Sequence, residues 1–158
     1  MPKKPFTYIS LFSCAGVGCY GFKQAGFECV ATNELSSRRL AIQKYNPKCH
    51  RNEGYVCGDI TLDSTKQLIY DEIAWWKDKR YISEIDVVIA TPPCQGMSIF
   101  NHKKNDRDIE RNSLVIESLN IVKQIQPKFF VFENVPAFMD TECIIEGGER
   151  CSIGEAHQ

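Results

Sequence analysis

The sequence lacks a long hydrophobic run, and it lacks an excess of charge of either sign. No apolar stretch approaches the roughly 20 residues that a helix needs to cross a bilayer. Residues 1–12 are not followed by the apolar core and cleavage site of a signal peptide. Nineteen Lys and Arg residues nearly balance 20 Asp and Glu residues, so the molecule has no general attraction to nucleic acid or to anionic membranes. These absences predict a cytoplasmic globular protein with no membrane partner.

The closely spaced cysteine pairs that are typical of zinc sites are also missing. Eight cysteines are present, but none of them forms a Cys-x-x-Cys pair. Two groups, Cys49 with His50 and Cys57, and Cys143 with Cys151, are weak metal candidates. Without an export signal, a disulfide framework is not expected either. Most of the cysteines are therefore predicted to pack as small buried hydrophobes, and we expect no bound metal.

What the chain does contain is a regular alternation of strand and helix patterns, in a length suited to one domain. The predicted strands are 6–12, 28–34, 55–60, 84–91 and 128–134. The predicted helices are 20–27, 36–46, 64–79 and 112–126. The apolar residues expected near one face of the third helix are Leu68, Ile69, Ile73, Trp75 and Trp76. This alternation predicts the α/β class, with a mostly parallel, doubly wound sheet.

Two segments do not follow the alternation. Residues 101–112 are densely charged without an apolar period, which is typical of a solvated loop. Residues 141–158 begin with a strand-like or hairpin-like pattern around Gly147 and Gly148. We therefore expect a main domain over residues 1–140 and the start of a continuation over 141–158.

A glycine motif follows the first predicted strand. Residues 16–21 match G-x-G-x-x-G before a predicted helix, where glycines allow a tight turn and a close approach to a ligand. Because the carboxyl ends of parallel strands form one edge of a sheet, a single crevice should bring together five residues. These are Phe12, Glu34, Asp59, Thr91 and Glu133. Glu34 could bind ribose hydroxyls there, and the motif alone fits NAD as well as other nucleoside cofactors.

The stretch VVIATPPCQG at 87–96 places a cysteine directly after two prolines. Pro92 and Pro93 fix their own φ angles, and each restricts the residue before it to an extended conformation. Cys94 would thus be held at the sheet edge, where its thiolate could act as a nucleophile. The alternative is a buried cysteine beside a proline turn. His102 lies in the charged segment rather than in an activating motif, which argues against a Cys-His hydrolase.

Glu133 and Asn134 end the fifth predicted strand, which a simple strand order places next to the fourth. A partly buried carboxyl group at Glu133 would face Cys94, stay protonated and donate a proton. The alternative is a cap on the following turn, made by Asn134 and Pro136.

Three segments, taken in this order and at these spacings, resemble one known family. They are FSCAGVG at 12–18, PPCQ at 92–95 and ENV at 133–135. Over about residues 8–138 they resemble the first half of a DNA (cytosine-5)-methyltransferase. The resemblance implies a Rossmann-like fold that transfers a methyl group from S-adenosylmethionine to C5 of cytosine in double-stranded DNA, as in restriction-modification systems.

The resemblance also implies roles for individual residues. Cys94 would attack C6 of a flipped-out cytosine and form a covalent adduct, and Glu133 would protonate N3. The implied S-adenosylmethionine residues are Phe12, Ala15, Gly16, Val17, Gly18, Glu34, Leu35, Asp59, Ile60, Pro93 and Leu114. The implied DNA-binding residues are Gln95, Ser98, Lys103, Lys104 and Arg111. Segment 101–112 would be the loop that closes on DNA.

The sequence departs from the family pattern at Cys14 and Val17, where glycines are usual, and at Ser10, where aspartate is usual. If φ is positive at Cys14, its Cβ could crowd the cofactor loop. The family's Arg-rich strand motif, its target-recognition region and the segment that completes the cofactor pocket are absent from the sequence.

Because of these absences, we expect the chain to be incomplete and inactive alone. It could be an expressed fragment, the product of a truncated reading frame, or one subunit of a split enzyme with a second chain. Two alternative functions belong to other functional classes. One is a cofactor-binding remnant without catalysis, and the other is an NAD-dependent oxidoreductase, against which PPCQ and ENV argue.

Overall fold

The computed structural model describes residues 4–93, 114–134, 142–144 and 150–152. Its main body is a five-stranded, all-parallel sheet with the strand order β3-β2-β1-β4-β5. The strands are β1 (Thr7–Leu11), β2 (Glu28–Glu34), β3 (Tyr55–Cys57), β4 (Val87–Ala90) and β5 (Phe129–Phe132). The helices are α1 (Tyr20–Gln24), α2 (Ser37–Tyr45), α3 (Asp63–Lys79) and α5 (Leu114–Ile125).

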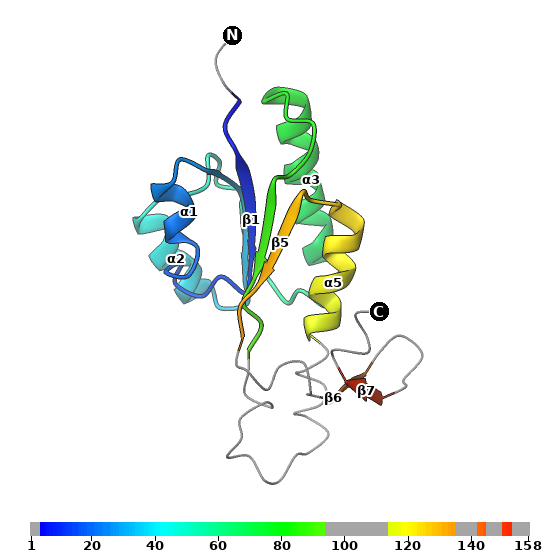
Figure 1. Cartoon of the computed structure of the whole chain (residues 1–158). Coiled ribbons are helices and arrows are strands. Elements are labelled where there is room, and N and C mark those ends of the chain that lie inside the picture. The colour runs from blue at the N-terminus through cyan, green and yellow to red at the C-terminus, as the bar shows by residue number, and fades with distance from the viewer. Residues whose placement is uncertain (1–3, 94–113, 135–141, 145–149, 153–158) are drawn as a thin grey trace.

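The helices cover both faces of the sheet, as the alternation of patterns predicts. α1 and α2 lie on one face, and α3 and α5 lie on the other (Figure 1). The chain runs outward from β1 to β3, then crosses back to place β4 on the other side of β1. This reversal makes the gap between β1 and β4 a topological switch point, where open α/β sheets bind ligands at the carboxyl ends of their strands.

The core forms on both faces of the central strand. All five residues of β1 are buried, and its three apolar side chains divide between two apolar clusters, one on each face of the sheet. Ile9 and Leu11 pack in the larger cluster with Trp76 of α3. Tyr8 packs in the smaller one, where its ring stacks on Phe22 at a centroid distance of 5.2 Å. Burial on both sides explains why β4, with the sequence VVIA, is a continuous apolar run.

Of the five apolar residues predicted near one face of α3, three are buried, Trp75 is partly buried and packs against the core, and Leu68 is misplaced. Ile69, Ile73 and Trp76 are buried, and their i, i+4, i+7 spacing forms one stripe. Leu68 is 52% exposed. Leu68 precedes Ile69 by one residue and therefore lies about 100° away from it around the helix, outside the buried stripe.

A small antiparallel pair lies near the carboxyl end of the chain. β6 (Glu142–Ile144) pairs with β7 (Arg150–Ser152), and Cys143 lies opposite Cys151. This pairing agrees with the strand-like pattern that the sequence shows after residue 141. Among the described residues, no helix is long and apolar enough to cross a membrane.

Candidate cofactor and catalytic site

A cavity of about 600 Å³ opens at the carboxyl ends of β1, β2, β3 and β4. It lies where the strand order reverses, as expected for this class of sheet. Its walls come from the turns that follow the four strands, from α2 and from the first residue of α5. The lining residues are Phe12, Cys14, Asn33, Glu34, Leu35, Ser36, Arg39, Gly58, Asp59, Ile60, Thr61, Thr91, Pro93 and Leu114.

Most of the residues implied for the cofactor meet in this cavity. Seven of the eleven line it, namely Phe12, Glu34, Leu35, Asp59, Ile60, Pro93 and Leu114. The glycine loop does not. Ala15, Gly16 and Val17 line a second hollow of about 210 Å³ beside Gln43 of α2, and Gly18 belongs to neither lining.

Gln43 explains why the glycine loop packs against α2. Its side chain is buried, and Nε2 donates to the Cys14 carbonyl at 2.6 Å and to Ser13 Oγ at 2.8 Å. A Cβ on Gly16, where φ is +88°, would lie 3.1 Å from Gln43 Cγ. Gln43 is not among the residues predicted for the site. The available signal was its position three residues after Leu40, which puts a polar side chain on the buried face of α2.

Glu34 is the best-anchored polar group of the cavity. It ends β2 and is only 5% exposed. Its Oε2 accepts the backbone N–H of Cys14 at 2.9 Å, and its Oε1 accepts that of Ser36 at 2.9 Å. Arg39 Nη1 lies 3.7 Å from Oε1. The carboxylate thus ties the loop after β1 to the start of α2 and keeps free lone pairs for a ligand.

The turn after β1 contains two residues with positive φ, Phe12 at 54° and Cys14 at 49°. Cys14 therefore has the positive φ at which, as the sequence suggested, its Cβ could crowd the cofactor loop. The turn is attached to β2 because Ser13 Oγ donates to the Asn33 carbonyl at 2.9 Å and accepts from Thr32 Oγ1 at 2.7 Å. These polar contacts hold the strained turn against the end of β2.

The turn after β3 places Asp59 and Ile60 at the cavity. Asn33 Nδ2 donates to the Gly58 carbonyl at 3.1 Å, and Gly58 N donates to the Glu34 carbonyl at 3.1 Å. A Cβ on Gly58 would lie 2.6 Å from Thr65 Oγ1, so glycine permits the close packing. Asp59 Oδ1 accepts from Thr61 N and Oγ1, which fixes the carboxylate at the rim.

Glu133 differs from the prediction. The end of β5 lies beside the end of β4, as expected, since Glu133 N donates to the Ala90 carbonyl at 3.1 Å and Asn134 Nδ2 to the Pro92 carbonyl at 3.3 Å. The Glu133 side chain is exposed, however, and does not line the cavity. The expected partial burial is therefore wrong for the described structure. The reason is that β5 is the outermost described strand and has only β4 as a neighbour.

The predicted nucleophile and the predicted DNA contacts lie outside the described residues. They are Cys94, Gln95, Ser98, Lys103, Lys104 and Arg111. Pro93, which precedes Cys94 directly, lines the cavity. Thr91, two residues earlier, donates from Oγ1 to the Phe12 carbonyl at 3.1 Å and joins the turns after β1 and β4.

Of the two weak metal candidates, Cys143 and Cys151 lie opposite each other as a pair, whereas Cys49, His50 and Cys57 have separate surroundings. Cys49 contacts Cys29, the His50 ring packs edge-on against Trp76 at 5.9 Å, and Cys57 is exposed. Within the described parts of the chain, no group of three or more Cys, His, Asp or Glu side chains could hold a metal ion.

Comparison with known proteins agrees with the fold. The family model of the C-5 cytosine-specific DNA methylases matches residues 6–143. The type II methyltransferase M1.HgaI of Avibacterium volantium is 31% identical over 91% of this chain and 38% of its own length. M.XorII of Xanthomonas oryzae pv. oryzae is 38% identical over 80% of this chain and 27% of its own length.

A solved structure shares the fold. A protein described as a DNA modification methyltransferase encoded within an E. coli prophage is 28% identical and aligns with a TM-score of 0.60. The alignment covers 85% of this chain and 33% of that chain. The present chain thus spans about a quarter to two fifths of the length of these relatives. The match of the family model over residues 6–143 shows that the chain belongs to the C-5 cytosine-specific DNA methylase family.

Proposed function

We propose that the chain supplies the S-adenosylmethionine site and the catalytic residues of an enzyme that methylates C5 of cytosine in double-stranded DNA, in a restriction-modification system. The observation that carries the proposal is the cavity. It is lined both by a buried carboxylate, Glu34, and by Pro93, the residue directly before Cys94. The named relatives are type II methyltransferases, which supports the same reaction.

The residues present fit a nucleoside cofactor that carries an amino-acid tail. A volume of about 600 Å³ lies within the usual range for pockets that enclose small molecules. Glu34 would accept the ribose hydroxyls, and Leu35 would pack on the adenine. Asp59 and Ile60 would bind the edge of the adenine, while Phe12, Pro93 and Leu114 would complete the apolar wall. S-adenosylmethionine, when bound, would supply an electrophilic methyl group.

The chain's own catalytic groups would act on the cytosine. The Cys94 thiolate would add to C6, and Glu133 would donate a proton to N3, which makes C5 nucleophilic. After the methyl group has reached C5, loss of the C5 proton and of the thiolate would restore the aromatic ring. An exposed Glu133 is consistent with a group that becomes enclosed only when a flipped base fills the site.

DNA contacts are proposed for Gln95, Ser98, Lys103, Lys104 and Arg111, with segment 101–112 closing over the duplex. Because the chain spans well under half the length of the relatives named above, methyl transfer is expected to need residues beyond this sequence. These would come from the same polypeptide or from a second chain.

Calorimetric titration of the 158-residue chain with S-adenosylmethionine, and with NAD as the comparison ligand, tests the proposal. We expect S-adenosylmethionine alone to bind. Glu34→Gln should weaken binding at least tenfold, because a hydrogen bond to a charged acceptor contributes about 1.5–3 kcal/mol. Glu28→Gln is the matched control, since Glu28 begins the same strand far from the cavity and pairs with Arg80. Binding of NAD would contradict the proposal and favour the oxidoreductase alternative.

A further inference from the structure

Two thiols face each other between β2 and the segment that leads into β3. Cys29 is the second residue of β2 and is only 1% exposed, while Cys49 is partly exposed. The two residues form a parallel bridge, and their Sγ atoms lie 3.5 Å apart. The pair has no place in the proposed methyl transfer, because Cys29 lies five residues before Glu34, roughly 17 Å along the strand.

The backbone places the two cysteines at a separation that suits a disulfide. Neighbouring strands lie about 4.8 Å apart, inside the range of roughly 4.4–6.8 Å between Cα atoms in disulfides. A bond length of about 2.05 Å requires the two sulfur atoms to approach by about 1.5 Å. Rotation about the two Cα–Cβ bonds can supply this movement without a shift of β2.

Polar groups around the pair influence its reactivity. Burial raises the pKa of the Cys49 thiol, while the nearby Lys48 ammonium acts in the opposite direction. Lys48 Nζ also lies 2.8 Å from Cys19 Sγ. This contact keeps the ammonium charge of Lys48 close to the Cys29–Cys49 pair. The buried Tyr8 hydroxyl lies beside Cys29 and interacts with its sulfur. Burial opposes ionisation of Cys29, but its contacts with Cys49, Lys48 and Tyr8 outweigh burial, so the pKa of the Cys29 thiol lies below its ordinary value. Lys48 and Tyr8 would both stabilise a thiolate as it forms.

We propose that Cys29 and Cys49 form a site of reversible oxidation, at which a hydroperoxide converts the two thiols into a disulfide. The Cys49 sulfur, the more exposed of the two, attacks one peroxide oxygen. The O–O bond breaks, and with hydrogen peroxide the other oxygen leaves as water. The Cys29 sulfur then attacks the Cys49 sulfenic acid, the S–S bond forms, the S–O bond breaks, and a second water leaves. Two electrons pass from the thiols to the peroxide, and a dithiol can reverse the change.

The expected consequence is a more stable β2–β3 edge with an unchanged cavity. The disulfide joins residues 29 and 49 and so restricts the unfolded chain between them. It also attaches the segment before β3 to the strand against which that segment already packs, since a Cβ on Gly54 would lie 2.7 Å from the Val30 carbonyl oxygen. This inference does not depend on the proposed methyl transfer.

Peptide mapping of the oxidised wild-type chain tests the pairing directly. The reduced protein is treated with hydrogen peroxide, blocked with iodoacetamide and digested with trypsin without reductant. Cleavage at Lys23, Arg38, Lys48 and Arg51 isolates Cys29 in peptide 24–38 and Cys49 in peptide 49–51. We expect the two peptides linked, with the loss of two hydrogen atoms, and separated again by dithiothreitol. Oxidation should also raise the Tm by roughly 5–10 °C.

Two variants separate this pair from the other thiols. Cys49→Ala should lose both the linked peptide and the rise in Tm. Cys57→Ala is the matched control, because Cys57 is exposed on β3, and it should behave like the wild type. The proposal is overturned if saturating peroxide leaves both peptides unlinked in the wild type, if Cys49 is found joined to Cys19 instead, or if the rise in Tm persists in Cys49→Ala.

Discussion

Cys14 carries a side chain at a backbone conformation that favours glycine. Its φ is 49°, and its N–H donates to Glu34. Cys14→Gly should therefore raise the free energy of unfolding by about 0.5–1 kcal/mol, because positive φ costs less without a Cβ. Chemical denaturation measures this change. Cys14→Ala keeps the Cβ and should show no comparable gain, and an equal gain in both variants would mean that the thiol, not the backbone, is the source of the cost.

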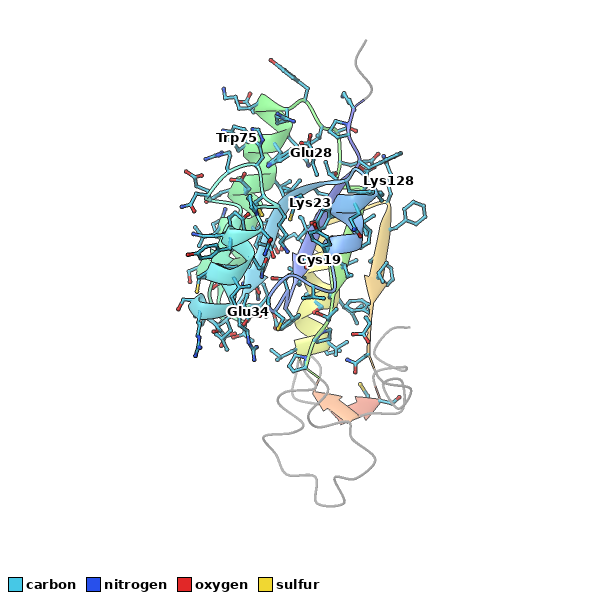
Figure 2. The ribbon with its side chains drawn as sticks, turned by 90° about the vertical axis from the view of Figure 1, so that its left-hand side faces the viewer. Cys19, Lys23, Glu28, Glu34, Trp75 and Lys128 are labelled. Carbon is cyan, nitrogen blue, oxygen red and sulfur yellow. The ribbon has the colours of Figure 1, made fainter. Side chains whose placement is uncertain are left out.

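Asp86 joins the starts of β1 and β4. Its Oδ2 accepts the Thr7 N–H at 2.7 Å, and its Oδ1 lies 2.6 Å from Lys128 Nζ, at the end of the sheet far from Glu34 (Figure 2). Burial opposes ionisation of Asp86, but the Lys128 ammonium and the Thr7 donors outweigh it, so the pKa of Asp86 lies below its ordinary value.

A lowered pKa means that the unfolded chain takes up this proton first. The stabilisation from Asp86 is complete above the ordinary aspartate pKa of about 3.9 and is lost as the pH falls below it. Asp86→Asn should cost about 1 kcal/mol at pH 7 and flatten the acid side of the stability curve. Denaturation at several pH values measures this effect. The control is Glu84→Gln, which removes the other Lys128 partner and should leave the acid side unchanged.

Cavity residues could be predicted from the sequence when they lie at the end of a strand. Glu34 and Asp59 were found because every parallel strand ends at the same edge. Gln43 and Arg39 were missed, since their contribution depends on how α2 packs against the loop after β1. The exposure of Glu133 could not be predicted, because it depends on what lies beyond β5 rather than on the local sequence.

The contact between α3 and the segment before β3 includes one buried carboxylate. Glu72 is 3% exposed, accepts from Trp76 Nε1 at 3.1 Å and lies 3.5 Å from Arg51 Nη1. The Arg51 guanidinium also covers the Trp75 ring at 4.1 Å. Burial raises the pKa of Glu72, and the Arg51 cation offsets part of that rise.

Arg51→Met should therefore destabilise the protein by about 2 kcal/mol at pH 7, because it leaves a buried charge without its cation. A raised pKa means that the folded chain binds this proton more tightly, so the loss should shrink as the pH falls towards the ordinary glutamate value of about 4.3. The measurement is a double-mutant cycle, which compares the free energies of unfolding of the wild type, Arg51→Met, Glu72→Gln and the double variant. Additive effects, or a loss that does not change with pH, would contradict this account.

At the level of elements, the strand and helix order could be predicted because the two periodicities, 2 and 3.6, leave different patterns in the sequence. All five predicted strands and all four predicted helices are present, most with trimmed ends. Leu68 is the exception. An apolar residue next to a buried stripe cannot be assigned to it without knowledge of how the helix is rotated against the sheet.

At the level of the whole molecule, the decisive test concerns Cys94 in an assembled enzyme that contains the rest of the relatives' length. Cys94→Ser should abolish methyl transfer to DNA while S-adenosylmethionine affinity stays within a factor of about two, because in the proposed mechanism the thiol acts on the base and not on the cofactor. Incorporation of radiolabelled methyl groups into DNA measures transfer. Cys57→Ser serves as the control thiol. Transfer at the wild-type rate by Cys94→Ser would remove Cys94 from the mechanism.

The central position of β1 has a consequence for synthesis on the ribosome. β1 pairs with β4, and the Thr7–Asp86 contact joins residues that are 79 positions apart. At a translation rate of about 5–20 residues per second, synthesis of the chain between β1 and β4 takes roughly 4–16 s. During that interval one edge of β1 has no partner strand, and we expect the nascent chain to be open to chaperones that bind extended hydrophobic segments. Codons that slow elongation between β1 and β4 would lengthen this exposure and lower the yield of folded protein.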